Sequence, residues 1–235
     1  MQKLVIASNV MNEINQLPRW FSWVKQVADG GILLVDTGSD DGTVEYAQKQ
    51  GAVVVTDPII RTEGYGPARN QLRELSKKYF PDAKWCFYSD ADETISEEEF
   101  HTLRWIKDYL IDGFDVVAFP RIDWHDLEMT KAENDYRFAP DWQARMTRLD
   151  SPVNYYRRLH EQIRDYRGIY CNLTTPKINH FHRAIKEKRD LVGRLCAYLH
   201  AKDEYGNTYP EHPREAFYRE QYQKYGLDGV AKERA

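Results

Sequence analysis

Three groups of acidic and polar side chains each follow a short apolar segment of the chain. They occupy residues 9–13, 36–41 and 90–93. The third group reads Asp90-Ala91-Asp92-Glu93, and an Asp-x-Asp pair offers the hard oxygen ligands that Mg²⁺ or Mn²⁺ takes beside water and nucleotide phosphates. Carboxylates held close together repel each other by about 1 kcal/mol a pair even in water, and a divalent cation relieves that repulsion. The Asp90-Ala91-Asp92 segment could also be an ordinary solvated loop. Because it directly follows an apolar strand, we favour a metal site over a solvated loop.

The elements that precede these groups predict an α/β protein. Strands are expected at residues 3–8, 31–36, 52–56, 84–89 and 114–120, because each is a short, largely apolar run. The apolar residues of 31–36 are consecutive, as in a parallel sheet that is covered on both faces. Helices are expected over 17–27, over 43–50, and after a capping box formed by Ser96 and Glu99. Strands that alternate with helices predict a doubly wound parallel sheet, which binds ligands at the carboxyl ends of its strands.

Two common phosphate-binding motifs are absent from the sequence. No segment reads as a P-loop, and residues 64–68 lack the third glycine and the preceding strand of a dinucleotide fingerprint. We therefore expect a metal ion, rather than a glycine-rich loop, to neutralise a bound diphosphate.

The second half of the chain has a different composition. Residues 1–120 hold 12 Lys and Arg against 19 Asp and Glu, whereas residues 121–194 hold 15 against 11. This excess of positive charge fits either an anionic partner or an ordinary solvated surface. Alternating segments at 143–149 and 166–173 predict antiparallel strands, and apolar spacing predicts helices at 183–201 and 213–225.

Four segments in chain order resemble the signature of family 2 glycosyltransferases with the GT-A fold. They are residues 6–13 (IASNVMNE), 33–43 (LLVDTGSDDGT), 66–70 (GPARN) and 87–93 (FYSDADE). The resemblance implies a GT-A type α/β sheet and a nucleotide-diphosphate sugar donor, with a UDP-sugar as first choice. It also implies a divalent metal, Mn²⁺ or Mg²⁺, at the Asp-x-Asp motif and inversion at the anomeric carbon.

The resemblance also assigns site residues. Asp36 matches the acidic residue that meets the nucleobase, although the family often has two aspartates where this chain has Asp36 and Thr37. Asp92 matches the aspartate that coordinates the cation, and Asp90 the one near the ribose and the metal. The full set of expected nucleotide-sugar contacts is Asn9, Glu13, Asp36, Arg69 and Asp90.

The acceptor side is expected between residues 121 and 182. Residues 140–145 (PDWQAR) and the pair His160-Glu161 are similar to acceptor-side motifs of bacterial members that decorate saccharides. An inverting transfer needs a carboxylate base, for which Glu161 is the first choice and Asp141 the second. An ion pair with a neighbouring arginine is the alternative for Glu161. Metal-dependent GT-A enzymes can take a late histidine ligand, which makes His180 and His182 candidates.

The whole chain reads as one glycosyltransferase domain. Residues 1–120 form its nucleotide-sugar half, 121–182 its acceptor half and 183–235 a C-terminal helical segment. Its three cysteines form no CxxC pair, and no apolar run approaches the roughly 20 residues of a membrane span. We therefore expect a cytoplasmic protein without a transmembrane segment. A peripheral contact with a membrane surface stays open.

Three functional interpretations remain. The acceptor is expected to be a saccharide or glycoconjugate. Two alternatives are an enzyme that glycosylates modified nucleic-acid bases, weakly supported by the Arg and Tyr content of residues 121–194, and a nucleotide-sugar-binding protein without catalysis.

Overall fold

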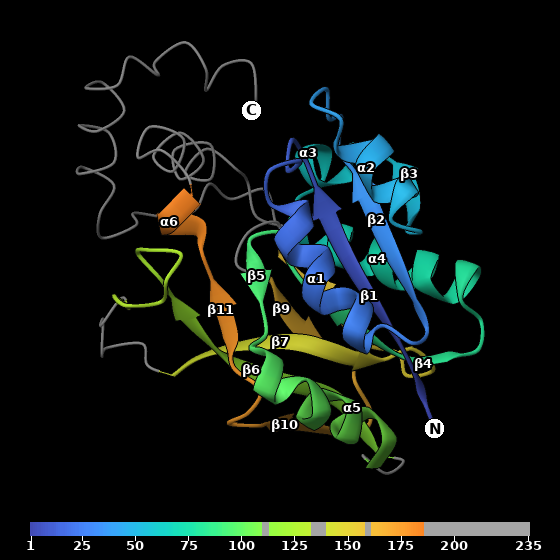
Figure 1. Cartoon of the computed structure of the whole chain (residues 1–235). Coiled ribbons are helices and arrows are strands. Elements are labelled where there is room, and N and C mark those ends of the chain that lie inside the picture. Colours follow the sequence, from blue (N-terminus) through green and yellow to red (C-terminus); the bar gives the residue numbers. More distant parts are fainter. Residues whose placement is uncertain (110–112, 133–139, 158–160, 186–235) are drawn as a thin grey trace, which may run out of the picture.

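One twisted sheet forms the centre of the molecule (Figure 1). The computed structural model describes residues 1–109, 113–132, 140–157 and 161–185. The strand order is β3-β2-β1-β4-β7-β6-β11-β5, and β10 pairs with β6 beside β11. The strands are β1 (Lys3–Val10), β2 (Gly31–Asp36), β3 (Val53–Thr56), β4 (Ala83–Tyr88), β5 (Glu93–Thr94), β6 (Phe114–Asp123), β7 (Asp141–Arg148), β10 (Ile169–Asn172) and β11 (Ile178–His180).

The first half of the sheet is parallel and covered on both faces, as predicted. Strand β1 lies between β2 and β4 and runs parallel to both. Its residues alternate between two apolar cores, with Leu4 and Ile6 in one and Val5 and Ala7 in the other. Because both faces are buried, every one of these positions is apolar, which explains the consecutive apolar run.

The helices divide between the two faces. Helices α1 (Leu17–Val27), α2 (Thr43–Lys49) and α5 (Phe100–Tyr109) pack on the core that contains Leu4, while α4 (Tyr65–Tyr79) packs on the opposite core (Figure 1). The described residues also form two short helices, α3 (Ile59–Thr62) and α6 (His182–Ile185). The sequence analysis predicted neither α3 nor α4.

The predicted capping box at the start of α5 is wrong. Ser96 does precede a helical segment, but that segment begins as the 3₁₀ turn η1 (Glu97–Glu99), and no side chain caps it. The Ser96 hydroxyl accepts a hydrogen bond from Asn179. The Glu99 carboxylate instead accepts from the Thr175 hydroxyl and the Lys177 amide. Both side chains therefore bind the distant β11 segment in place of the helix end.

Strand β7 interrupts the parallel pattern. It pairs antiparallel with β4 on one edge and with β6 on the other, which confirms the antiparallel strand expected at residues 143–149. The same expectation for residues 166–173 is wrong, because β10 pairs parallel with β6. Alternating polarity reports a half-buried face, and it does not report the direction of the neighbouring strand.

Two more features complete the fold. Strands β8 (Asn154–Tyr156) and β9 (Gln162–Arg164) form a separate antiparallel hairpin. In the described part of the chain, no helix combines the length and hydropathy that crossing a bilayer requires. Nearly all of the helix expected at 183–201, the whole of the helix at 213–225, and His160 lie outside the described residues.

Candidate active site

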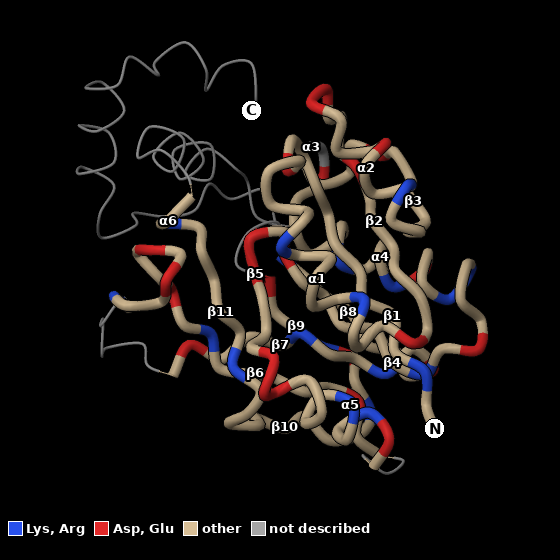
Figure 2. The backbone as a smooth tube through the Cα atoms, in the orientation of Figure 1, with Lys and Arg blue, Asp and Glu red and all other residues tan. Residues whose placement is uncertain are grey.

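The carboxyl ends of β1, β2 and β4 meet at one edge of the sheet, where the three polar groups of the sequence lie. Figure 2 shows acidic positions in the loop beyond β2 and in the segment that leads into β5. Strand register places Asn9 opposite Val35 and Val10 opposite Asp36. The parallel arrangement therefore gathers residues far apart in sequence along a common edge.

Asp36 builds the turn that follows β2. Its carboxylate accepts hydrogen bonds from the Gly38 amide at 3.0 Å, from the Ser39 amide at 3.1 Å, and from the Ser39 hydroxyl. The residue is only 2% exposed. All three donors belong to its own turn, so this carboxylate sets the shape of the loop beside Asn9.

Asn9 and Glu13 shape the loop after β1. Asn9 is half-buried, and its Oδ1 has no hydrogen-bond partner among the described residues. The Glu13 amide donates to the Thr43 hydroxyl at 2.9 Å, and its carbonyl accepts from Gln16 and Leu17 at the start of α1. The Glu13 backbone thus joins the β1 loop to both α1 and α2, while Asn9 offers an unpaired acceptor.

Asp90 lies between two arginines. Its Oδ1 is 2.8 Å from Nη2 of Arg69, and its Oδ2 is 2.8 Å from Nη2 of Arg145. Both guanidinium groups are buried, with 5% of each side chain exposed. Burial alone would raise the pKa of Asp90, but the two cations outweigh it and hold that pKa far below its usual value. Asp90 is therefore ionised with both carboxylate oxygens engaged.

Arg145 is the principal site residue that the sequence analysis did not assign. It lies on β7 and contacts the buried Glu93 carboxylate as well as Asp90. The Glu93 Oε2 accepts in turn from the Asp90 amide at 3.0 Å. The only signal for Arg145 was its place at the end of the PDWQAR segment, because no periodicity indicates that β7 lies directly beside β4.

Asp92, His180 and His182 form a group with the geometry of a metal site. Their ligand atoms lie within 4.8 Å of one another. Asp92 Oδ1 is 3.6 Å from His180 Nε2, and its Oδ2 is 3.6 Å from His182 Nδ1. The two imidazole rings are stacked, with centroids 5.5 Å apart. Pairing of β11 with β5 explains the approach, since His180 is opposite Glu93 in that ladder.

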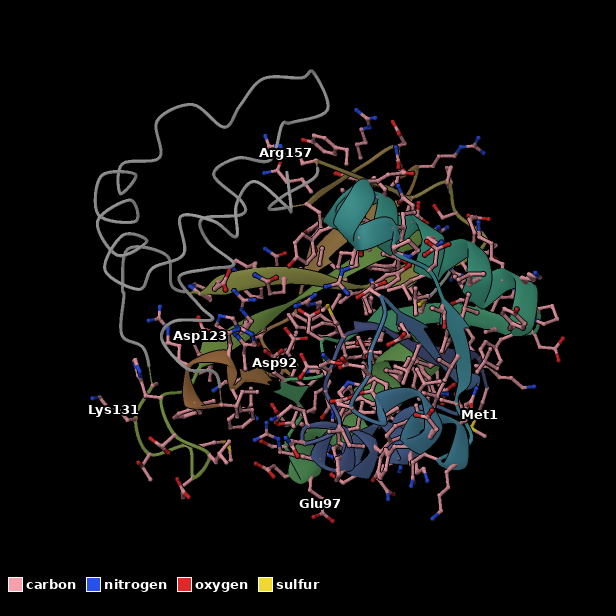
Figure 3. The ribbon with its side chains drawn as sticks, turned by 90° about the horizontal axis from the view of Figure 1, so that it is seen from above. Met1, Asp92, Glu97, Asp123, Lys131 and Arg157 are labelled. Carbon is pink, nitrogen blue, oxygen red and sulfur yellow. The ribbon has the colours of Figure 1, made fainter. Side chains whose placement is uncertain are left out.

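A further carboxylate orients one of these histidines. Asp123, at the end of β6, is hydrogen-bonded to Nδ1 of His180, and the other ring nitrogen of His180 faces Asp92. Figure 3 labels Asp92 and Asp123 in this part of the molecule. Burial opposes ionisation of Asp123, yet the His180 hydrogen bond and the nearby Arg121 lower its pKa to about 2. A carboxylate that holds a histidine in this way is the usual outer partner of a metal ligand, and the donor set fits a divalent transition ion.

The two expected base residues have different surroundings. Glu161 Oε1 lies 3.3 Å from Nε of Arg69. It therefore forms an ion pair with an arginine far away in the sequence, on helix α4. Asp141 binds Arg121 at 2.8 Å and accepts from the Gln143 amide group at 2.8 Å. The structure thus brings Glu161 into the Asp90 network and places Asp141 beside Arg121.

Comparisons with known proteins bear on the fold. No protein-family model matches the sequence, and a search of curated proteins finds no relative. Among solved structures, residues 1–349 of TarS from S. aureus align with 97% of this chain and 72% of that one, at 12% identity and a TM-score of 0.51. The longer TarS chain gives 11% identity and 0.49, and this chain spans only 44% of it.

A second protein is similar over a shorter stretch. It is glucosyl-3-phosphoglycerate synthase from Mycobacterium tuberculosis in complex with Mn²⁺, UDP and glucosyl-3-phosphoglycerate. The identity is 19% over 51% of this chain and 44% of that one, with a TM-score of 0.37. The mostly parallel sheet, the flanking helices and the alignment with TarS over nearly the whole length show that this chain has the GT-A fold.

Proposed function

We propose that this protein is a metal-dependent, inverting glycosyltransferase. It would move a sugar from a nucleotide-diphosphate sugar, with a UDP-sugar as first choice, to a hydroxyl of a saccharide or glycoconjugate. One observation carries the proposal: the Asp92, His180 and His182 group lies beside the ionised Asp90 and its two arginines at the ligand-binding edge of a GT-A sheet.

The metal residues provide one half of the chemistry. Asp92, His180 and His182 would hold Mn²⁺ or Mg²⁺, and their two imidazole nitrogens favour Mn²⁺. The ion would act as a Lewis acid on the leaving diphosphate. Asp90 is a less suitable ligand, because each of its oxygens already contacts an arginine. Arg69 and Arg145 add positive charge where negative charge develops on the leaving group.

The loops after β1 and β2 would bind the nucleotide. No described residue donates a hydrogen bond to Oδ1 of Asn9, and the turn built by Asp36 lies next to it. A nucleobase that donates to this buried oxygen would satisfy a group that otherwise costs free energy to bury. Glu13 supports this pocket through its backbone contacts with α1 and α2.

Glu161 would act as the general base. Its ion pair with Arg69 orients the carboxylate beside the Asp90 network, where it can remove a proton from the acceptor hydroxyl. Asp141 is the second candidate. It contacts Gln143 and Arg121, and Arg121 also lies 3.8 Å from Asp123. Conservative variants of the two residues distinguish these roles, because only the variant of the base should lose turnover.

The first experiment tests the metal site. We expect UDP to bind the wild-type protein in the presence of Mn²⁺ and to bind poorly in EDTA, and we expect Asp92→Ala to abolish the Mn²⁺-dependent part. Calorimetric titration measures both. Asp126→Ala is a matched control, because Asp126 is a half-buried loop aspartate that binds Thr130 and Lys131. UDP binding that is equally tight with and without the metal would contradict the proposal.

The second experiment tests the base. A thermal-shift screen of nucleotide sugars with Mn²⁺ identifies the donor, since a bound ligand stabilises the fold by mass action. With that donor, Glu161→Gln should lower turnover by about 10² to 10⁴ while donor affinity barely changes. If Asp141→Asn loses turnover instead, the two roles are exchanged. If the wild type binds a nucleotide sugar but neither hydrolyses nor transfers it, the protein is a nucleotide-sugar-binding protein without catalysis.

A further inference from the structure

The side chain of Asn70 joins helix α4 to the β8–β9 hairpin. Its Nδ2 donates to the Tyr155 carbonyl at 2.8 Å, and its Oδ1 accepts from the Tyr155 amide at 2.8 Å. The same Nδ2 also donates to Oδ1 of Asn154 at 2.7 Å. One carboxamide therefore satisfies both backbone polar groups of Tyr155, as a neighbouring strand would.

Two further contacts seat the hairpin on the same helix and on the sheet. The Gly66 amide donates to the Arg157 carbonyl at 3.0 Å, and a Cβ at Gly66 would come within 2.6 Å of that oxygen. Tyr155 is buried, and its hydroxyl donates to the Ala144 carbonyl on β7 at 2.9 Å. Strand β8 is thus held at its middle by Asn70 and just past its end by Gly66.

The hairpin carries Glu161 back toward α4. Tyr156 pairs with Gln162 across the hairpin, so Glu161 lies immediately before the paired segment of β9. Its carboxylate reaches Arg69, the residue that precedes Asn70 on α4. Neighbouring helix residues point about 100° apart, which allows Arg69 to face Asp90 and Glu161 while Asn70 faces β8. Two adjacent residues of α4 therefore have separate tasks: Arg69 contacts Asp90 and Glu161, and Asn70 holds the hairpin on the helix.

We infer that Asn70 is a positioning residue for the transfer reaction. It holds the β8–β9 hairpin in one register on α4, and it thereby fixes the Glu161 carboxylate relative to Arg69 and Asp90. The inference rests on the proposed function, because the position of Glu161 matters most if Glu161 is the base. A displacement of about 1 Å at a reacting group can lower a rate by about a hundredfold.

Two variants of Asn70 test this role. Asn70→Ala removes all three hydrogen bonds. Asn70→Asp has almost the same size and keeps an acceptor for the Tyr155 amide, but it places a carboxylate oxygen against the Tyr155 and Asn154 oxygens. Asn154→Ala is the matched control, since it leaves both bonds between Asn70 and the Tyr155 backbone. Glu74→Gln controls for changes on the exposed face of α4.

Two measurements are made on the full chain. Hydrogen exchange at the Tyr155 amide requires no ligand, and we expect it to be about tenfold faster in Asn70→Ala, the factor that the loss of one hydrogen bond commonly produces. Turnover is measured as UDP released from UDP-glucose with Mn²⁺. We expect it to fall about tenfold or more in both Asn70 variants, with the affinity for UDP and Mn²⁺ within about twofold of the wild type. Both controls should behave as the wild type in turnover.

The outcomes separate this inference from the proposed function. Unchanged Tyr155 exchange in Asn70→Ala would overturn the inference, and so would faster exchange with unchanged turnover. An equal loss of UDP affinity and turnover would place Asn70 in the donor site and would also overturn it. A wild-type protein that neither binds UDP nor releases it from UDP-glucose would contradict the proposed function, and the exchange result would then decide by itself whether Asn70 holds the hairpin.

Discussion

Two aspartates at the same edge of the sheet have opposite surroundings. Asp36 ends β2, and its carboxylate is satisfied by Gly38 and Ser39, two and three residues further on. Asp90 follows β4, and its carboxylate contacts Arg69 and Arg145, which are 21 and 55 residues away. Both lie at strand ends, yet Asp36 closes a local turn, whereas Asp90 links the end of β4 to α4 and β7.

The contrast separates loop building from chemistry. A carboxylate that is satisfied within its own turn shapes the backbone and can be replaced by water where the donors are near the surface. A carboxylate held between buried arginines has no such substitute, because each buried arginine would lose one of its two carboxylate partners. We therefore expect the long-range network to dominate stability and activity, and the local turn to contribute modestly.

The largest expected effect on stability is that of Arg145→Ala. This change leaves the buried Glu93 and the partly buried Asp90 without their shared cation, and removal of one partner of a buried ion pair typically costs about 3 to 5 kcal/mol. Urea denaturation measures the free energy of unfolding. Lys84→Ala breaks the exposed pair with Asp150 and should cost about 0 to 1 kcal/mol. Equal losses of unfolding free energy in Arg145→Ala and Lys84→Ala would show that the buried network contributes no more to stability than an exposed ion pair.

A smaller effect is expected from Asp123, a second carboxylate with distant partners. Its folded pKa of about 2 lies below the ordinary value of about 3.9. Its contribution to stability is therefore complete above roughly pH 4 and is lost as the pH falls toward 2. Unfolding curves of the wild type and of Asp123→Asn should converge over that interval, from a difference of about 2 kcal/mol. A difference that stays constant with pH would show that Asp123 does not act through its charge.

The smallest expected effect on stability is that of Asp36→Ala. Gly38 is exposed and Ser39 is half-buried, so water can replace the lost acceptor, and we expect a cost of about 1 kcal/mol in the free energy of unfolding. Nucleotide affinity should weaken by about 1 to 3 kcal/mol, because the turn borders the proposed base pocket. UDP titration of the variant checks the second number. A stability loss as large as that of Arg145→Ala would show that Asp36 also belongs to the long-range network.

The same division explains how much the sequence predicts. Consecutive apolar residues were enough to predict β1, β2 and β4, since burial on both faces leaves a clear pattern. Helix α4 was missed because its buried face includes Arg69, Arg73 and Ser76, so the helix lacks a continuous apolar stripe. Its buried arginines bind carboxylates and carbonyls that belong to other elements.

The site was predictable only in part for a related reason. Family resemblance suggested Asp92, His180 and His182, and the structure brings these three together. Arg145 received no role, because its position depends on the pairing of β7 with β4, a long-range contact that no local pattern reports. The predicted direction of β10 was wrong for the same reason, since its parallel pairing with β6 is also a long-range contact.

The place of β7 between β4 and β6 has a consequence for protein engineering. A fragment that stops at residue 120 would keep the parallel strands but leave the edge of β4 open, and an open, apolar strand edge invites pairing with another chain. We expect such a fragment to aggregate rather than to fold as a portable nucleotide-binding module. Strand β7, from the second half of the chain, closes that edge. The two halves must therefore fold together, and a chimaera should not be joined between β4 and β7.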